Sequence, residues 1–213
     1  MTTPALRALQ RLGARYDLAA LQPPDAAYAR IARSAQRREA WRSLRQWCLA
    51  GLGTGGQPGA ALAVAVLEHA ARDRAQAHAL AQALCLERDG SLQLLACRSR
   101  AERLALRLKT KLHDITPGRQ PLPTDAWDAG LLPGTADALQ ALARFEPRRP
   151  TLMVALGLPI PALRAICALL HARQMHYDRP VRLLLVTGLQ GLEMGWPVSR
   201  FPMDTLTPAG KPA

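Results

Sequence analysis

The last third of the chain has the clearest pattern of apolar and polar positions. Residues 151–158, TLMVALGL, form a continuous apolar run between prolines, which is typical of a strand buried on both faces. Residues 180–188, PVRLLLVTG, repeat this pattern. Between the two runs, apolar residues recur at helical spacing: Ile160, Leu163, Ile166, Cys167 and Leu170. Strand, helix and strand in succession predict a βαβ unit with parallel strands and a right-handed crossover.

The middle of the chain is rich in alanine and leucine. The apolar run QWCLAG (46–51) is expected to be a strand, and residues 59–86 a long helical segment. SLQLLAC (91–97) is a candidate strand, because Asp89-Gly90 precedes it and a basic run follows it. The pattern further predicts a helix over 100–113 with Leu104, Leu108 and Leu112 on one stripe, a loop over 115–125 and a helix over 135–145.

The first 45 residues are predicted to be an arginine-rich helical extension. A short basic helix ends at LQPPD, where Asp25 is suited to cap a second helix over 26–44. The apolar residues of that helix are few, so it is expected to pack on something larger. Its arginines fall on two sides, with Arg30, Arg33 and Arg37 on one and Arg38, Arg42 and Arg45 on the other.

These elements predict an α/β protein with an open, mostly parallel sheet covered by helices. The predicted parts are the extension (1–45), the α/β core (46–194) and a proline-rich tail (195–213) that is loosely packed or extended. Two alternatives stay open on the sequence alone. The glycine-rich turn described below can belong to a different α/β fold, or the apolar runs can be turns of buried helices in a mainly helical protein.

The chain carries 28 Lys and Arg against 16 Asp and Glu, a net charge of +12. The excess is concentrated in residues 1–48 and 98–111, which favours contact with phosphates or with an acidic protein. Arginine dominates over lysine, and together with the high alanine content this is also typical of a GC-rich coding sequence. No run reaches the length of a membrane span, and no secretory leader is evident. We therefore expect a cytoplasmic protein.

The cysteines and histidines give no metal-binding pattern. The four cysteines form no C-x-x-C pair and lie in apolar stretches, so they are expected to be buried thiols. His171 and His176 are five residues apart, which does not place them on one helical face. No metal and no cofactor are expected. Asp125 and Asp128 near Trp127 are interpreted as solvated caps rather than as a catalytic pair.

The segment GTGGQPGA (53–60) is the strongest candidate for a binding loop. Glycines at such a turn let backbone N–H groups point at a phosphate. The segment fits the frame G-x-G-G-x-G-K-[ST] at Gly53, Gly55 and Gly56, and it resembles the loop of the STAND-type signalling ATPases, a branch of the P-loop NTPases. RPTLMVAL also resembles the family's strand before the Mg²⁺-coordinating acid, and PVRLLLVTG is similar to its sensor strand, where Thr187 is either a relic sensor or a capping hydroxyl.

The chain departs from this family at the residues that carry its chemistry. Pro58, Gly59 and Ala60 stand where the frame has its last glycine, lysine and hydroxyl residue, and Ala155-Leu156 stands where the acid is expected. These groups supply charge stabilisation in phosphoryl transfer. The resemblance therefore implies a degenerate NTPase-like domain without hydrolysis.

The sequence thus predicts a catalytically inactive interaction or regulatory module that binds a partner protein or a larger assembly. Gly53, Gly55, Gly56 and Gly59 are candidates for a backbone scaffold or a weak phosphate site. A second hypothesis is a nucleic-acid-associated accessory protein, with phosphates contacted by the N-terminal arginines, Trp41 and Trp47 near them, or by the run 98–111. A third, an enzyme holding a cofactor phosphate in the glycine loop, lacks the acid of a dinucleotide site.

Overall fold

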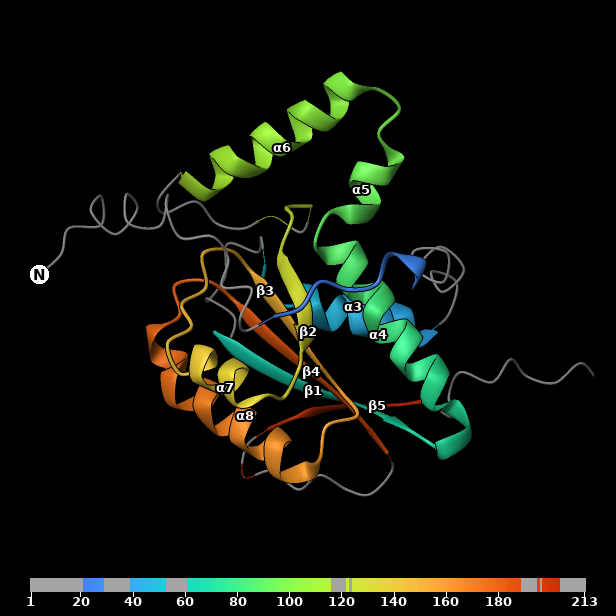
Figure 1. The fold of residues 1–213 in the computed structure, drawn as a ribbon, viewed down its shortest axis with the longest axis vertical. Coiled ribbons are helices and arrows are strands. Elements are labelled where there is room, and N and C mark those ends of the chain that lie inside the picture. The colour runs from blue at the N-terminus through green and yellow to red at the C-terminus, as the bar shows by residue number, and fades with distance from the viewer. Residues whose placement is uncertain are drawn as a thin grey trace, which may run out of the picture.

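The computed structural model describes residues 21–28, 39–52, 61–115, 122, 124–188, 195 and 197–203. Its centre is a five-stranded sheet in the order β2-β3-β4-β1-β5, and every neighbouring pair of strands is parallel (Figure 1). The strands are β1 (Leu62–His69), β2 (Asp128–Leu132), β3 (Thr151–Leu156), β4 (Val181–Gly188) and β5 (Ser199–Pro202). The fold is therefore α/β, as the sequence predicted.

The three inner strands are apolar along almost their whole length. In β3 and β4 nearly all side chains are buried, and in β1 only Ala63 and Glu68 are half-buried. Side chains that alternate along a strand point to opposite faces of the sheet. A strand without a polar face must be covered on both sides, which is the usual state of a parallel sheet.

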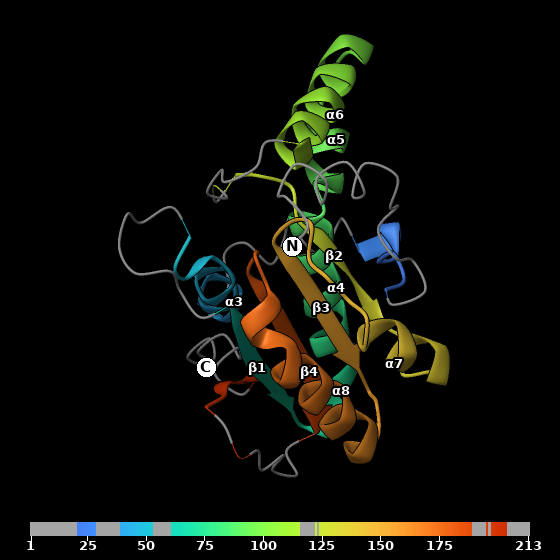
Figure 2. The ribbon, with the colours of Figure 1, turned by 90° about the vertical axis from the view of Figure 1, so that its left-hand side faces the viewer.

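Helices supply this cover on both faces (Figure 2). On one face, α3 (Glu39–Leu49) and α4 (Arg74–Arg88) pack with Leu67, Val154 and Leu184. On the other face, α7 (Ala136–Leu142) and α8 (Ile160–Arg173) pack with the neighbouring side chains of the same strands. The described residues also contain three short 3-10 helices: η1 (Ala26–Tyr28), η2 (Ala71–Asp73) and η3 (Gln174–His176).

The order of the strands explains why the helices lie on two faces. From β1 the chain passes over β4 and β3 to β2, at one edge of the sheet. It then returns one strand at a time through β3 and β4, and finally passes over β1 to β5 at the other edge. Such crossovers are right-handed, so a reversal of direction along the sheet places the connecting helices on the opposite face. The reversal lies between β1 and β4, which pair from Leu62↔Val181 to His69↔Gly188.

A helical arm is inserted into the connection from β1 to β2. Gly90, with a φ of 82°, ends α4 and turns the chain into α5 (Ser91–Ala96). A Cβ at this position would also lie 3.3 Å from Cβ of Ala126, so both the backbone conformation and the narrow space favour glycine. The next helix, α6 (Arg100–Ile115), lies beyond α5 and away from the sheet in both ribbon views (Figures 1 and 2).

A buried arginine joins α3 to the sheet. Arg182 is the second residue of the apolar strand β4 and is only 2% exposed. Its guanidinium donates from Nε to the carbonyl of Cys48 at 3.2 Å and from Nη2 to that of Ala50 at 2.8 Å. The last carbonyls of a helix have no partner within the helix, and the C-terminal end favours cations. Arg182 therefore acts as a C-terminal cap for α3.

Both edges of the sheet are protected. At the β2 edge, Gln22 forms an isolated antiparallel bridge with Leu131, with two backbone hydrogen bonds of 2.8 Å. At the β5 edge, Pro202 ends the strand and has no N–H to offer another strand. Of the proline-rich tail expected at 195–213, the four residues of β5 pair with Ala65–Glu68 of β1, and residues 204–213 lie outside the described residues.

Several sequence predictions are confirmed. The strands at 151–156 and 181–188, the helix between them, and the helices over 100–115 and 136–142 are present, and Thr135 caps the last of these by accepting from Ala138 N–H. The arginine-rich extension cannot be judged as a whole, because residues 1–20 and 29–38 lie outside the described residues. Within it, Trp41 and Leu44 belong to the core that covers the sheet, and α3 continues across the boundary expected at residue 45.

Other predictions are wrong. The run 46–51, expected to be a strand, is the end of α3 and the turn after it. Residues 59–86, expected to be one helix, contain β1 and most of α4, while 91–97, the second candidate strand, contains α5. Alanine at 61, 63 and 65 favours helix locally, but the β-branched Val64 and Val66 and burial on both faces stabilise a strand. The short edge strands β2 and β5 were missed.

We expect Arg182→Met to lower the free energy of unfolding by about 2–4 kcal/mol, because it leaves buried carbonyl groups at the end of α3 without their charged donor. Urea denaturation followed by circular dichroism measures this loss. Arg164→Met, on the exposed side of α8, is the matched control and should change the value by less than about 0.5 kcal/mol. Equal effects of the two substitutions would contradict the capping role.

Candidate functional site at the carboxyl edge of the sheet

The reversal between β1 and β4 defines the candidate site. In open α/β sheets, ligands bind outside the carboxyl ends of the strands where neighbouring crossovers leave toward opposite faces. At this place β1 ends at His69, β4 ends at Gly188, and β3 is followed by Gly157. The helix α4 begins a few residues after β1, so its first turns lie beside the same edge.

Two histidines and an arginine meet on the α4 side of this edge. The rings of His69 and His78 are edge to face, with centroids 6.0 Å apart. His69 is 6% exposed, and its Nδ1–H donates to the carbonyl of Ala70 at 3.0 Å. Nε2 of His78 is buried and has no hydrogen-bond partner among the described residues. Burial lowers the pKa of His78, and the charges of Arg74 and His69 lower it further.

Gly157 allows this group to approach the sheet. Its φ of 59° is a left-handed conformation that side chains disfavour. A Cβ there would lie 3.1 Å from Nη2 of Arg74 and 3.5 Å from Cε1 of His78. The guanidinium and the imidazole therefore lie beside the backbone of Gly157, which itself stays exposed. The N–H of Gly157 donates to the carbonyl of Val186 at 3.3 Å.

An ion pair occupies the α8 side of the same edge. Glu68, the residue before His69, points to the opposite face of β1 and pairs with Arg200 of β5. Thr187 of β4 lies opposite Glu68 in the strand register. The pair joins the C-terminal strand to β1, so the carboxylate has a structural partner and is not aimed at an open site.

The edge does not carry the groups of an NTPase. The connection from β1 to α4 reads Ala70-Ala71-Arg72-Asp73, without a glycine run or a lysine, and the carboxylate of Asp73 lies 3.4 Å from Nε of Arg72. The end of β3 is Ala155-Leu156, as read from the sequence, so no carboxylate follows this strand. Among the described residues, the edge can offer positive charge and imidazole groups, but not the lysine, hydroxyl and acid that phosphoryl transfer uses.

The glycine segment itself lies outside the described residues, including Gly53, Gly55, Gly56 and Gly59. Its flanks are described, and they differ from the prediction. A helix, α3, precedes it and a strand, β1, follows it, whereas a phosphate-binding loop connects a strand to a helix. The segment therefore leads to the amino end of β1, while the crossover reversal places the candidate site at the carboxyl end.

The arginines predicted to contact a partner are only partly described. Arg30, Arg33, Arg37 and Arg38 lie outside the described residues. Arg42 and Arg45 are exposed on α3, and Nε of Arg45 lies 2.8 Å from Oε1 of Glu87 on α4.

The two tryptophans expected beside these arginines are not available for contact. Trp41 is 1% exposed and Trp47 is 9% exposed, and both pack in the core between α3 and the sheet. They cannot stack on bases, so one part of the nucleic-acid hypothesis is lost.

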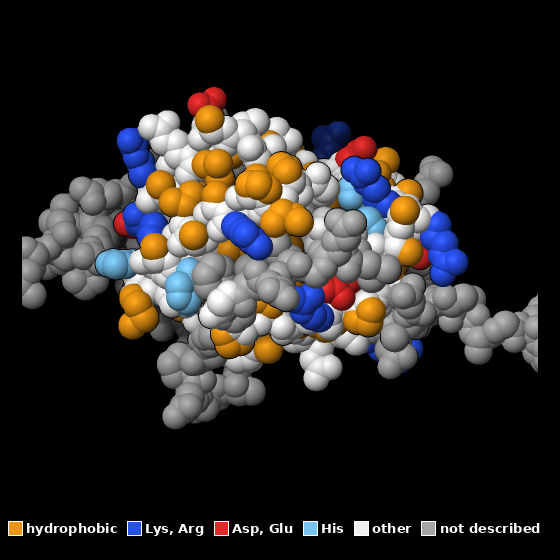
Figure 3. All heavy atoms as spheres, turned by 90° about the horizontal axis from the view of Figure 1, so that it is seen from below, with side chains coloured by type: hydrophobic (Ala, Val, Ile, Leu, Met, Phe, Trp, Pro, Cys, Tyr) orange, Lys and Arg blue, Asp and Glu red, His pale blue; other side chains and the backbone are white. Residues whose placement is uncertain are grey.

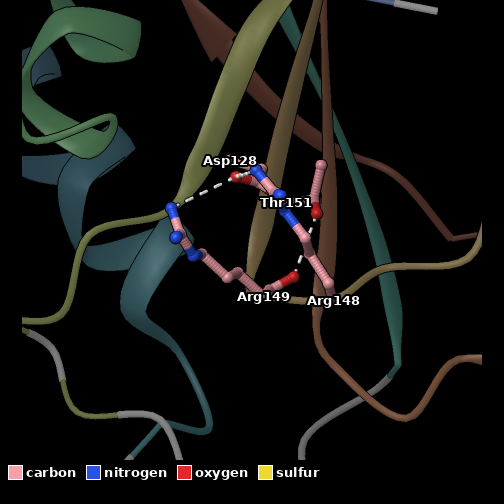
Figure 4. Close-up of polar contacts among 4 residues, drawn as sticks. All are labelled: Asp128, Arg148, Arg149 and Thr151. Carbon is pink, nitrogen blue, oxygen red and sulfur yellow. Dashed lines mark hydrogen bonds and ion pairs between the residues drawn. The ribbon is translucent and has the colours of Figure 1, made fainter. Parts of the chain in front are cut away.

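The interpretation of Asp128 as a solvated cap is wrong (Figure 4). It is buried at the amino end of β2, where Arg148 donates to it from Nε at 2.8 Å and from Nη2 at 3.1 Å, and Arg149 approaches at 3.5 Å. This edge is opposite the candidate site, and the pairing fixes the loop before β3. The other carboxylate, Asp125, caps a turn by accepting from the N–H of Leu122 at 2.9 Å. Arg148-Arg149, directly before a buried strand, was the sequence feature that could have predicted a buried acidic partner.

The cysteines are free thiols, as predicted, and Cys48, Cys85 and Cys167 are buried. Burial raises the pKa of Cys48 and of Cys167 to about 12, so both remain protonated and unreactive near neutral pH. Within the described ranges, no group of three potential ligand residues is placed to hold a metal ion. No described helix is both long enough and apolar enough to cross a bilayer.

The face opposite the arm is only partly described. In the view from below, apolar, basic, acidic and histidine side chains are interspersed there (Figure 3).

Comparison with protein-family models, curated proteins and solved structures gave no match. The site is therefore defined by this chain's own geometry: an edge with converging basic groups and, separately, the exposed helical arm.

We expect His78 to make stability depend on pH. Because its pKa is lowered in the folded protein, the unfolded chain binds more protons once the pH falls below about 6.5, the ordinary pKa of histidine. The stability that the neutral His78 contributes is fully present above this pH, and it is lost as the pH falls toward the lower pKa of the folded state. Urea unfolding at several pH values should show this loss for the wild type and a flatter profile for His78→Gln.

The matched control is His176→Gln, because His176 is exposed at the end of η3. This variant should keep the pH dependence of the wild type. An Arg74→Ala variant should raise the pKa of His78, measured from its ring proton by NMR, since it removes a repelling charge. An unchanged His78 pKa in Arg74→Ala would show that the two side chains do not interact.

Proposed function

We propose that this protein is a non-catalytic α/β module that acts by binding a protein partner. The observation that carries the proposal is the carboxyl edge of the sheet. The place where an α/β fold commonly assembles its active site holds Arg74, His69 and His78 at one face and a closed ion pair at the other. Among the described residues, neither face of this edge presents a lysine or a carboxylate without a cationic partner.

A likeness to the P-loop NTPases is part of this proposal at the level of architecture. The two strands that resemble the metal-binding and sensor strands of that family, β3 and β4, are neighbours and parallel. In such a core the phosphate loop would follow β1, where this chain has residues 70–73 instead of a glycine run. The proposed module thus keeps a nucleotide-binding type of scaffold and uses it for support.

Binding rather than turnover also fits the distribution of exposed groups. The α5–α6 arm extends from the connection after α4 and presents apolar and basic side chains to solvent. Connections between strands are the usual carriers of function, because they change without disturbing the core. The nucleic-acid alternative rests on exposed cations alone and stays a prediction, tested below together with the protein partner.

We expect no magnesium-dependent release of phosphate from ATP or GTP above the rate of the buffer. Calorimetric titration with ATP, ADP and inorganic phosphate should give at most millimolar affinity, because a few cations without a lysine and backbone cradle hold phosphate weakly. A weak signal that disappears in Arg74→Ala would locate residual anion binding at the β1 end. Magnesium-dependent turnover that Arg74→Ala or Thr187→Ala abolishes would refute the non-catalytic proposal.

A further inference from the structure

The helix α6 begins with a locally encoded cap. Ser99 and Glu102 form a capping box: the hydroxyl of Ser99 accepts from the N–H of Glu102 at 3.1 Å, and Oε2 of Glu102 accepts from the N–H of Ser99 at 3.4 Å. The same oxygen accepts from the N–H of Arg98 at 2.7 Å. A box of this kind fixes a helix start without help from tertiary contacts. The arm therefore presents a preformed helix to a partner.

This helix exposes an apolar stripe. Leu104 is 59% exposed and Leu108 is 52% exposed, whereas most other large aliphatic side chains of the described residues are buried or half-buried. Ala101 and Ala105 are exposed beside them. The four positions follow the spacing i, i+3, i+4 and i+7, which is the anchor spacing of a helix that lies in a groove. Two leucines in contact with water, one turn apart, indicate a surface that is covered in an assembly.

The stripe is flanked by cations. Arg98, Arg100, Arg103 and Lys109 are exposed along the same segment. Residues 98–111 carry six Lys and Arg against Glu102 alone, so the segment keeps a strong positive charge. The surface of α6 is thus apolar in the middle and positive on its sides, and the surface that complements it is apolar in the middle and negative on its rim.

We propose that α6 is the docking element of this protein and that it lies in an apolar groove with an acidic rim on a partner protein. This inference rests on the proposed function and names the surface that carries it. The leucines supply the contact area, and the cations fix the orientation and steer the encounter. Because the helix is already formed, little conformational entropy is lost on docking.

Other occupants fit the observations less well. A second copy would bring two positive flanks together, which is repulsive. A nucleic acid would neutralise the cations but leave Leu104 and Leu108 in water. A bilayer surface usually holds an amphipathic helix with aromatic residues at the level of the headgroups, and residues 98–115 contain none. An acid-rimmed protein groove uses both parts of the surface.

The test is to measure binding of the full chain to three probes by fluorescence anisotropy and cosedimentation. Calcium-loaded calmodulin supplies an apolar groove that accepts basic amphipathic helices. Vesicles of phosphatidylcholine and phosphatidylglycerol in equal parts supply an anionic bilayer, and a short DNA duplex supplies phosphates. We expect calmodulin to bind tightest of the three. Leu104→Gln/Leu108→Gln should weaken it by at least about tenfold, because two buried leucines are lost.

The control for the leucines is Met175→Gln, which removes an apolar side chain that is 88% exposed elsewhere on the surface and should leave binding unchanged. Arg100→Gln/Arg103→Gln should weaken binding and reduce its dependence on salt, whereas Arg72→Gln/Arg164→Gln should not. Circular dichroism and thermal unfolding verify that each variant is folded before its affinity is interpreted.

Each other result overturns the inference. Tighter binding to vesicles or to DNA would assign α6 to a membrane or a nucleic acid, and leucine-dependent self-association in sedimentation would assign it to a second copy. If calmodulin does not bind, or if it binds the double leucine variant equally well, the proposal that α6 docks in an apolar groove is refuted. These failures leave the non-catalytic proposal intact, because that proposal stands or falls by the separate hydrolysis assay.

Discussion

A parallel sheet whose central strands have no polar face is stable in water only when both faces are covered. The strands β1, β3 and β4 impose this condition, since their side chains are buried in both directions along almost the whole strand. With right-handed crossovers, helices reach both faces only if the chain reverses its direction along the sheet. The reversal between β1 and β4 is therefore a consequence of the hydrophobic pattern, and it fixes where an active site would lie.

The buried Arg182 shows how this packing includes a helix from before the first strand. α3 covers the sheet on the side of α4, and its last turn ends at the sheet surface, where unpaired carbonyls would be costly. A guanidinium suits this place because its five N–H donors are spread over a rigid fork and can reach several carbonyls at once. Burial lowers the pKa of Arg182, but arginine remains charged, so the carbonyls receive charge-assisted hydrogen bonds.

The sequence was a reliable guide where pattern and tertiary context agree. The βαβ unit of residues 151–188 is apolar, is bounded by prolines, and is long enough for the spacing of its apolar residues to identify strands and helix. β1 was misread because its alanines favour helix locally. Its strand conformation follows from the pairing with β4 and β5, which are distant in sequence. The site could not be read either, because the topology brings His69, His78 and Gly157 together. Arg182, a charge inside an apolar run, was a usable signal that was missed.

The position of the arm follows from the same topology. The crossover from β1 to β2 is the longest connection between strands, and it passes over β4 and β3 to reach the edge of the sheet. Lengthening a long connection costs little additional loop entropy, and an insertion there removes no core contact. The fold thus tolerates α5 and α6 at a point where they do not contribute to covering the sheet. Because Leu104 and Leu108 stabilise nothing in the sheet layers, their exposure is a cost to the isolated chain that a partner surface would offset, which places the functional contact on the arm and leaves the sheet as its rigid support.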